Sequence, residues 1–354
     1  MEGRLFGNLR VGYWLLLTVA AAEFTIGFLV GTTVGNIEPS SIFTLNGLSK
    51  MLPAWLILPL LWLGLVAITI TRRRIDRPAL VMWRLVRRNR YWLLRGLLFT
   101  AMVFPLGRAF TAFKSAIPSM VPFYADPIFV AADKIVFMGV DPWRITHAVI
   151  GPWGTVLIDR IYVLWFVVMM LLLGWLNFTR NQRLQLRGLL TYVLAWAVLG
   201  NMMATAFSSV GPCFYEEFFH NKHYASLMDI LRSYDEDHRL FALGSMRYLL
   251  NSLGEDRLGA GISAMPSLHV TIAYLCFLVT LEGVRSIWPK VLAGAFALLI
   301  FVGSIHLGWH YAVDGLVGIF VVTLIWIATG HLIAWLDRRS QPVSVAGEER
   351  LYLS

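Results

Sequence analysis

Two short segments of the chain combine residue types that could transfer a phosphoryl group. Residues 261–269 read GISAMPSLH and residues 306–314 read HLGWHYAVD, and among their residues are the imidazoles of His269 and His310 and the carboxylate of Asp314. One imidazole can attack phosphorus while the other protonates the leaving oxygen, so the pair needs no metal ion. Polar groups in a chain this apolar are costly unless they line a polar cavity, which makes them functional candidates.

The spacing predicts the elements that hold these residues. Pro266 suits the first turn of a helix, so Ser267 and His269 are expected in that turn, beside unpaired N–H groups that favour a phosphate. His310 and Asp314 are four residues apart and share one face if a helix starts near His310. The carboxylate would then hold one imidazole nitrogen and leave the other as a nucleophile. A lone histidine in an apolar helix is more often a packing residue, but two such segments together favour catalysis.

At these residues the sequence resembles the type 2 phosphatidic acid phosphatase (PAP2) superfamily. The Pro-Ser-Leu-His of residues 266–269 is similar to its second motif, and the His-Tyr-Ala-Val-Asp of residues 310–314 is similar to the core of its third. The residues at these motif positions are most similar to those of the branch that contains the inositol-phosphorylceramide synthases.

The resemblance implies a fold and a set of roles. The fold would be an all-α, polytopic membrane helix bundle with a six-helix catalytic core. In the family the third-motif histidine becomes a phosphohistidine. The resemblance implies that His310 is the nucleophile and that Asp314 orients it. It also implies that His269 protonates the leaving group and that Ser267 helps to bind the phosphate.

Two departures from the family pattern concern its cations. Phosphatase members carry an arginine six residues before the nucleophile, where this chain has Ser304. Their first motif, a lysine with Arg-Pro seven residues on, is not evident before Pro266. The synthase-like branch also lacks that arginine, so the departures favour transfer of a phospho-polyol, such as phosphoinositol, to a ceramide- or diacylglycerol-like alcohol. Hydrolysis of a phosphomonoester or pyrophosphate lipid, and non-enzymatic lipid transport, remain alternatives.

The composition indicates an integral membrane protein. Hydrophobic residues make up 58% of the chain and charged residues 14%. The net charge of +9 would suit a nucleic acid, but the arginines cluster between apolar segments, as membrane topology predicts. The two cysteines form no disulfide framework and no metal-ligand spacing is present. We therefore expect a membrane lipid as substrate, no nucleic acid, no metal and no cofactor; the oligomeric state is left open.

Hydropathy predicts about eight membrane-spanning helices. They cover approximately residues 11–34, 51–70, 92–113, 155–178, 188–210, 266–281, 291–307 and 311–336. Three segments connect these spans. Residues 72–90 are predicted to form an arginine-dense cytoplasmic loop and residues 115–153 a Pro-rich surface or re-entrant cap. Residues 211–261 are predicted to form a polar, solvated loop. The chain is predicted to divide into three parts. Residues 1–91 hold two N-terminal helices and a basic loop, residues 92–340 form a six-helix catalytic core, and residues 341–354 are a polar tail.

The distribution of positive charge predicts the orientation. With the N-terminus inside, the cytoplasmic segments hold eighteen of the thirty lysines and arginines. Both histidines then lie on the outer side, which predicts an active site on the periplasmic face of what we expect to be a bacterial inner membrane.

A phosphoryl group also needs fixed cations and donors. The backbone N–H groups of Ser267 and Leu268 are expected to supply some of the donors. The candidate cations are, in order of preference, Lys114, Arg108, Arg247 and Arg257. Glu23 lies inside the first apolar run, must face protein or a cavity, and is interpreted as structural.

Overall fold

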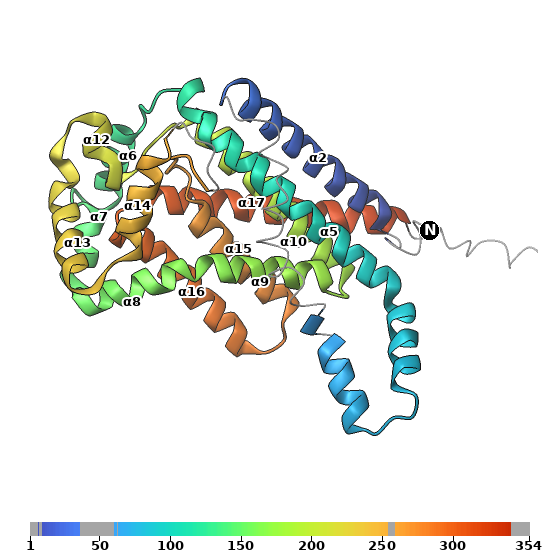
Figure 1. Cartoon of the computed structure of the whole chain (residues 1–354). Helices are drawn as coiled ribbons and strands as arrows, with labels where there is room; N and C mark the ends of the chain where they lie inside the picture. Colours follow the sequence, from blue (N-terminus) through green and yellow to red (C-terminus); the bar gives the residue numbers. More distant parts are fainter. Residues whose placement is uncertain (1–5, 7–8, 36–59, 62, 254–258, 341–354) are drawn as a thin grey trace, which may run out of the picture.

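The structure is a computed structural model that describes residues 6, 9–35, 60–61, 63–253 and 259–340. Helices are the only regular secondary structure in this part of the chain, which confirms the all-α prediction for it (Figure 1). The α-helices are α2 (Arg10–Thr33), α5 (Pro78–Met120), α6 (Asp126–Val136), α7 (Pro142–Val149), α8 (Pro152–Val163), α9 (Trp165–Phe178), α10 (Gln182–Ala195), α11 (Ala204–Ala206), α12 (Tyr215–Phe219), α13 (Ala225–His238), α14 (Phe241–Asn251), α15 (Leu268–Gly283), α16 (Ile287–His306) and α17 (Ala312–Ser340). A π-helix, η2 (Trp196–Met203), joins α10 to α11, and two short 3₁₀ turns are η3 (Pro212–Phe214) and η4 (Lys222–Tyr224).

Six helical stretches among the described residues are long and apolar enough to cross a membrane. They are α2, α5, α8 with α9, α10 through α11, α16 and α17. The predicted count of eight is not confirmed. Half of the second predicted span lies outside the described ranges, and the sixth corresponds to α15, an apolar helix of only 16 residues.

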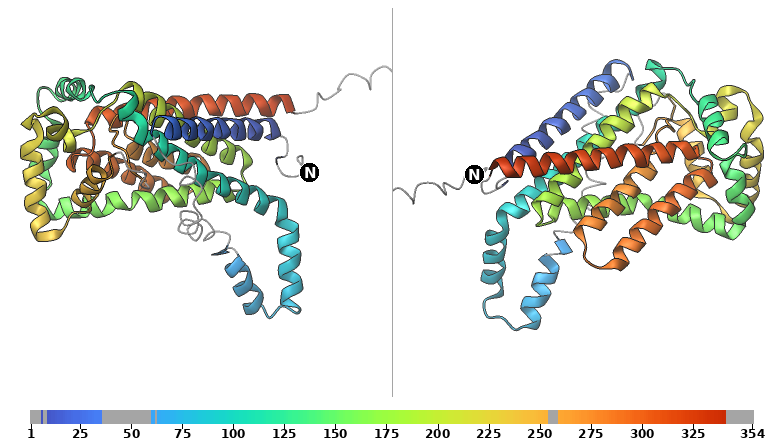
Figure 2. Two further views of the ribbon diagram at one scale, coloured as in Figure 1. Left: turned by 45° about the horizontal axis from the view of Figure 1, so that its top comes forward. Right: turned by 180° about the vertical axis from the view of Figure 1, so that it is seen from behind.

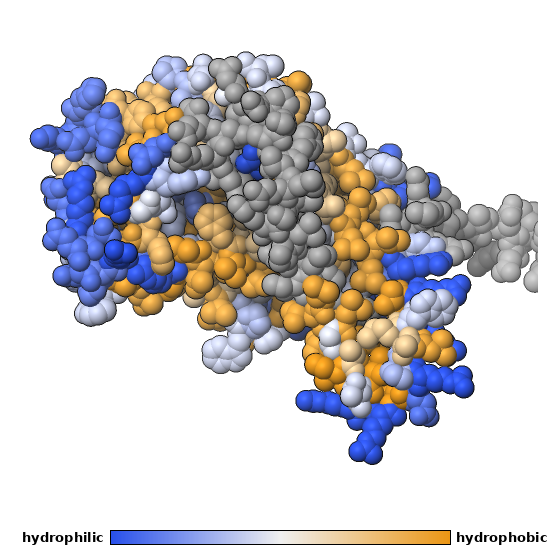
Figure 3. Space-filling model, viewed as in Figure 1, coloured by the Kyte–Doolittle hydropathy of each residue, from blue (hydrophilic) through white to orange (hydrophobic). Residues whose placement is uncertain are grey.

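The two ends of the molecule are polar and the middle is apolar. Helices α6, α7, α12, α13 and α14 gather at one end, and the arginine-rich start of α5 projects from the other in all three views (Figures 1 and 2). The space-filling view has a mainly hydrophobic surface between these ends (Figure 3). An apolar belt between two polar ends is the arrangement that a bilayer requires.

Two connections predicted as loops are helical. The arginine-dense segment joins the third span in one helix, α5, because Pro78 occupies its first turn, where a missing N–H costs nothing. The polar segment 211–261 contains α13 and α14. In α13 the apolar residues Leu227 and Leu231, four positions apart, are fully buried, so an amphipathic helix forms where a solvated loop was expected.

Helix α15 is the central element of the bundle. It packs against α9, α10, α16 and α17, and its buried residues include Val270, Leu275 and Val279. Because neighbours surround it, its N-terminus opens into the protein interior. The second motif is thereby placed inside the bundle.

Candidate active site

The second motif forms the N-cap and first turn of α15. Helix α15 begins at Leu268, with the Ser267 side chain accepting the Val270 N–H at 3.4 Å, so Ser267 is the N-cap residue. Pro266 therefore precedes the helix, one correction to the sequence prediction, and its peptide bond to Met265 is cis. A second correction concerns the expected phosphate donors: the Ser267 N–H donates to the Asp314 carbonyl at 3.2 Å.

The predicted phosphate-binding role of Ser267 has little support in this geometry. Its hydroxyl caps the helix, the residue is fully buried, and it does not line the cavity described below. What Ser267 does is join the two motifs, since its N–H bonds the carbonyl of the residue that orients His310.

The third motif fixes the ring of His310 immediately before α17. His310 Nδ1 lies 2.8 Å from the Ala264 carbonyl oxygen and 3.3 Å from Asp314 Oδ2. Both neighbours can only accept, so Nδ1 carries the proton and Nε2 of the neutral ring keeps its lone pair. Asp314 Oδ2 also accepts the Tyr311 N–H at 3.1 Å. The expected His–Asp contact thus forms, although α17 begins two residues after His310, and the closer partner is a carbonyl from the second-motif loop.

The structure brings the two candidate histidines together. The ring centroids of His269 and His310 are 6.0 Å apart with planes inclined at 56°. Rings at this separation are close enough for one phosphoryl group to contact both of them.

His269 has an aromatic setting. Its ring stacks on Tyr162 at 5.0 Å between centroids and lies 4.5 Å from the ring of Trp165. Trp165 Nε1 donates to the His269 carbonyl at 2.8 Å. Among the described residues no hydrogen bond reaches either ring nitrogen of His269, which lines a cavity.

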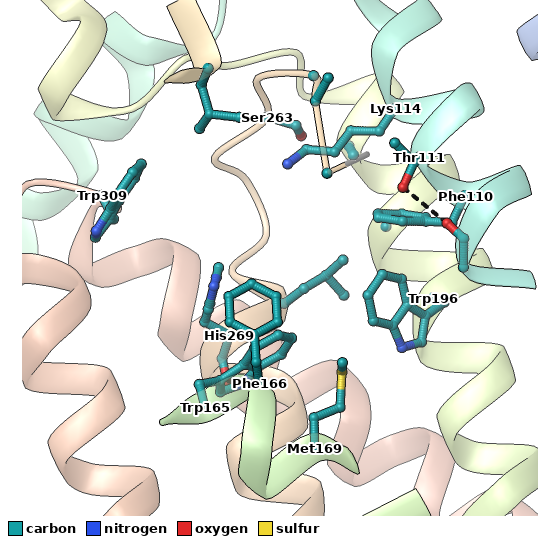
Figure 4. A pocket seen from close by; sticks show the side chains of 18 of the residues that line it. Phe110, Thr111, Lys114, Trp165, Phe166, Met169, Trp196, Ser263, His269 and Trp309 are labelled. Carbon is teal, nitrogen blue, oxygen red and sulfur yellow. Dashed lines mark hydrogen bonds between the residues drawn. The ribbon is translucent and has the colours of Figure 1, made fainter. Parts of the chain in front are cut away.

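That cavity has a volume of about 520 Å³, within the size range of small-molecule sites. His269, His310 and Lys114 line it together with many apolar side chains from α5, α9 and the α10–α11 stretch. Figure 4 shows Lys114 extending from α5 into the open space that His269 also faces. Lys114 makes no ion pair with a described residue, so its ammonium group is available to an anion.

A glycine allows the second-motif loop to approach Lys114. Gly261 has φ +89°, and a Cβ there would lie 2.9 Å from the Ser115 nitrogen and 3.0 Å from the Lys114 carbonyl carbon. Any other residue would be strained by the positive φ and would push the loop away from α5. This packing holds the cation beside the histidines.

The other predicted cations have different positions. Arg108 is buried in α5 and lines the cavity. Arg247 is mostly exposed on α14, lies 4.0 Å from Asp235 and does not reach the cavity, which corrects that prediction. Arg257 lies outside the described residues. Ser304, at the position of the family arginine, donates to the Phe301 carbonyl instead. No group of three or more potential metal ligands occurs in the described part of the chain.

Sequence reasoning missed two aspartates of α6 that hold the third motif in place. Asp133 accepts the N–H groups of Ala312 and Val313, the first residues of α17, each at 2.9 Å. Burial raises the pKa of Asp133 to about 6 despite these bonds. Asp126 accepts the Tyr311 hydroxyl at 2.9 Å and the Gly211 N–H at 2.8 Å.

The available signal for these two aspartates was their spacing. Asp126 and Asp133 are seven residues apart, two turns of one helix, in a segment otherwise rich in apolar residues. Such spacing places both carboxylates on the face that meets the bundle.

Comparison with known proteins gives the family. The model of the PAP2 superfamily matches residues 128–328, more than half of the chain. This chain belongs to the PAP2 superfamily. The match includes His269, His310, Asp314 and Asp133, whereas Asp126, Lys114 and α2 precede it. No curated protein and no solved structure gave a match.

Membership in the PAP2 superfamily indicates a membrane protein of the lipid phosphatase or phosphotransferase type. The more specific resemblance to inositol-phosphorylceramide synthases is not confirmed.

Proposed function

We propose that this PAP2 protein is a membrane lipid phosphotransferase that works through a phosphohistidine. It would move a phospho-head group, such as phosphoinositol, onto a ceramide- or diacylglycerol-like alcohol. The observation that supports this most strongly is the pair of histidines with ring centroids 6.0 Å apart, which line one cavity with Lys114, a residue that forms no ion pair with any described residue. The active site is proposed to face the periplasm of a bacterial inner membrane.

The first step forms the covalent intermediate. His310 Nε2 attacks phosphorus, and the bond between phosphorus and the leaving oxygen breaks. His269, starting in its protonated form, donates its proton to that oxygen. Asp314 and the Ala264 carbonyl stabilise the proton on Nδ1 as His310 becomes cationic. Lys114 balances the negative charge that gathers on the phosphoryl oxygens.

The second step releases the phosphohistidine. His269, now neutral, removes the proton from the acceptor hydroxyl, whose oxygen attacks phosphorus. The bond between His310 Nε2 and phosphorus breaks, and both histidines return to their starting protonation states. With water as acceptor the same steps give hydrolysis, so the identity of the acceptor separates a transferase from a phosphatase.

Two features of the chain favour transfer over hydrolysis. The arginine that phosphatase members place six residues before the nucleophile is replaced by Ser304, whose side chain bonds its own helix. The cavity lining is largely apolar, which suits a lipid acceptor entering beside the donor.

The test is turnover of a labelled donor with and without an acceptor. Purified protein in nanodiscs receives phosphatidylinositol labelled in its head-group phosphate, alone, with ceramide or with diacylglycerol. We expect labelled phospholipid product only when an acceptor is present, and acid-labile label on the protein at early times. Label released into water at the same rate without acceptor would overturn the transferase proposal in favour of hydrolysis. The absence of any turnover, together with no labelled protein, would favour a transporter.

A further inference from the structure

A second polar group lines the same cavity at the depth of the membrane helices. Glu23 of α2 is 6% exposed, and its side chain lines the cavity that contains His269 and Lys114. Helix α2, which contains Glu23, precedes the residues matched by the family model, so the roles of the second and third motifs do not explain a buried carboxyl group at this position. An ionisable residue inside a membrane helix is expensive and most often marks a functional path or site.

Glu23 is paired on one side only. Its Oε1 accepts a short hydrogen bond from Asn201 Nδ2. Among the described residues no hydrogen bond reaches Glu23 Oε2, and the buried Asn201 Oδ1 also has no partner there. Two oxygen acceptors therefore remain unsatisfied, and of these two residues Glu23 lines the cavity, where a ligand that donates a hydrogen bond would stabilise its Oε2.

The backbone around this pair is built to hold it. Asn201 belongs to η2, a π-helical stretch, and such stretches are frequent at functional sites. Gly27, one turn after Glu23, lets α2 approach α5 so closely that a Cβ there would lie 2.6 Å from the Ala109 carbonyl oxygen. The close approach presses the Glu23 side chain toward the cavity rather than toward lipid.

The register of α2 and α5 gives the depth of the pair. Gly27 meets Ala109 and Gly31 meets Ala112, so the two helices run parallel and Glu23 is level with about residue 105. Lys114 lies about nine residues further along α5, or about 14 Å at 1.5 Å per residue, which corresponds to a chain of about ten carbon atoms. A lipid whose phosphate contacts Lys114 would carry its hydrocarbon chain past Glu23.

We propose that Glu23 and Asn201 form a subsite that binds a hydroxyl group on the hydrocarbon chain of the lipid substrate, about ten carbon atoms from the phosphate. This inference rests on the proposed function, because the phosphate must occupy the histidine end of the cavity. Within the cavity the hydroxyl donates to Glu23 Oε2, while Asn201 holds the carboxyl group in place through Oε1. A plain chain leaves Oε2 unsatisfied, so the subsite selects hydroxylated chains.

The test measures binding, which does not depend on turnover. The probes are hexadecylphosphonate and its 10-hydroxy and 2-hydroxy derivatives, titrated calorimetrically into the full-length protein in nanodiscs. We expect the 10-hydroxy compound to bind the wild type roughly tenfold more tightly than the plain compound, as one hydrogen bond to an otherwise unsatisfied buried acceptor predicts. The 2-hydroxy compound, whose hydroxyl lies near the phosphonate, is expected to gain nothing.

Variants then locate the preference. Glu23→Leu is expected to abolish it, and Glu23→Gln to retain part of it. Thr25→Val is the matched control, because Thr25 lies on the exposed side of α2 and bonds only the Ala21 carbonyl; it should keep the full preference. Equal binding of all three probes by the wild type, or a full preference in Glu23→Leu, would overturn the inference. Unchanged binding of hexadecylphosphonate in Lys114→Met would instead show that the phosphate site of the proposed function is wrong.

Discussion

The two histidine segments are held in different ways. At the start of α17, hydrogen bonds hold both the His310 ring and the helix N-terminus. His310 Nδ1 contacts a carbonyl and a carboxylate, and Asp133 accepts the first N–H groups of the helix. At the start of α15, aromatic faces surround His269, and among the described residues its ring nitrogens have no hydrogen-bond partner.

The difference matches the two chemical roles that we propose. A nucleophile needs one tautomer with a free lone pair, and acceptors around Nδ1 enforce that state. An acid that later becomes a base must hold and lose a proton in each cycle. The rings of Tyr162 and Trp165 contact His269 without bonding its ring nitrogens, so no hydrogen bond among the described residues fixes its protonation state.

The largest expected effect comes from removing the nucleophile. His310→Ala should reduce turnover by roughly 10⁴-fold or more, because no other group can form the covalent intermediate. The measurement is product formation from the labelled donor, with early labelling of the protein as a second readout. His331→Ala, at an exposed histidine of the same helix, is the control and should retain wild-type turnover. Substantial labelling of the His310→Ala protein would mean that another residue is the nucleophile.

Removal of the acid–base group should cost less. We expect His269→Gln to lower turnover by roughly 10²- to 10⁴-fold, the usual contribution of a general acid or base. The loss should shrink for a donor whose leaving oxygen needs no protonation, such as a nitrophenyl phosphodiester, whereas His310→Ala should be equally inactive with it. Equal losses of His269→Gln for both donors would contradict the assignment of the two roles.

The sequence allowed prediction of the site where chemistry demands a local pattern. Both motifs are short and contain their own orienting residues, so the contact between His310 and Asp314 follows from their spacing, whereas Ser267 was expected in the first turn and is instead the N-cap. The positive-inside rule also placed both histidines at the same end of the bundle, and the structure brings them together.

Long-range contacts were beyond prediction. The Ala264 carbonyl that orients His310 is a backbone atom, which no residue type reveals. Arg247 was a reasonable cation by its place in the chain, but its helix turns it toward Asp235 and solvent. Asp133 lies in the segment 115–153, which was predicted to be a surface or re-entrant segment. In the structure its side chain, on α6, accepts N–H groups at the N-terminus of α17. Such pairings depend on how helices pack.

A moderate effect is expected from Asp133, a positioning residue that does not touch the substrate. Asp133→Ala leaves the Ala312 and Val313 N–H groups without their acceptor, at a cost of about 1–3 kcal/mol, so His310 loses its fixed position. We expect kcat to fall roughly tenfold with KM nearly unchanged, since the cavity lining is intact. Asp133→Asn, which keeps one of the two acceptor oxygens, should recover part of the loss. A rise in KM alone would contradict a positioning role.

Asp133 also predicts a dependence of stability on pH. Its pKa is raised to about 6 in the folded protein, so between about pH 4 and 6 the folded state retains a proton that the unfolded state has lost. The free energy of unfolding of the wild type should therefore fall, relative to Asp133→Asn, as the pH rises through this window. Chemical denaturation in detergent at several pH values measures this difference, and a wild-type stability that rises through the window relative to the variant would contradict the assignment.

The smallest expected effect tests whether ring packing alone holds His269. Trp165→Phe removes the indole N–H that donates to the His269 carbonyl at 2.8 Å but keeps an aromatic ring beside the imidazole. One hydrogen bond of this kind contributes about 1 kcal/mol, so we expect a slight loss of thermal stability and a change in turnover of no more than a few-fold. Trp165→Leu, which also removes the ring, should lower turnover further, because the imidazole then loses one of its two closest aromatic faces. If both variants lose the same activity, the hydrogen bond rather than the ring positions His269, and the two histidine segments are held by the same kind of interaction after all.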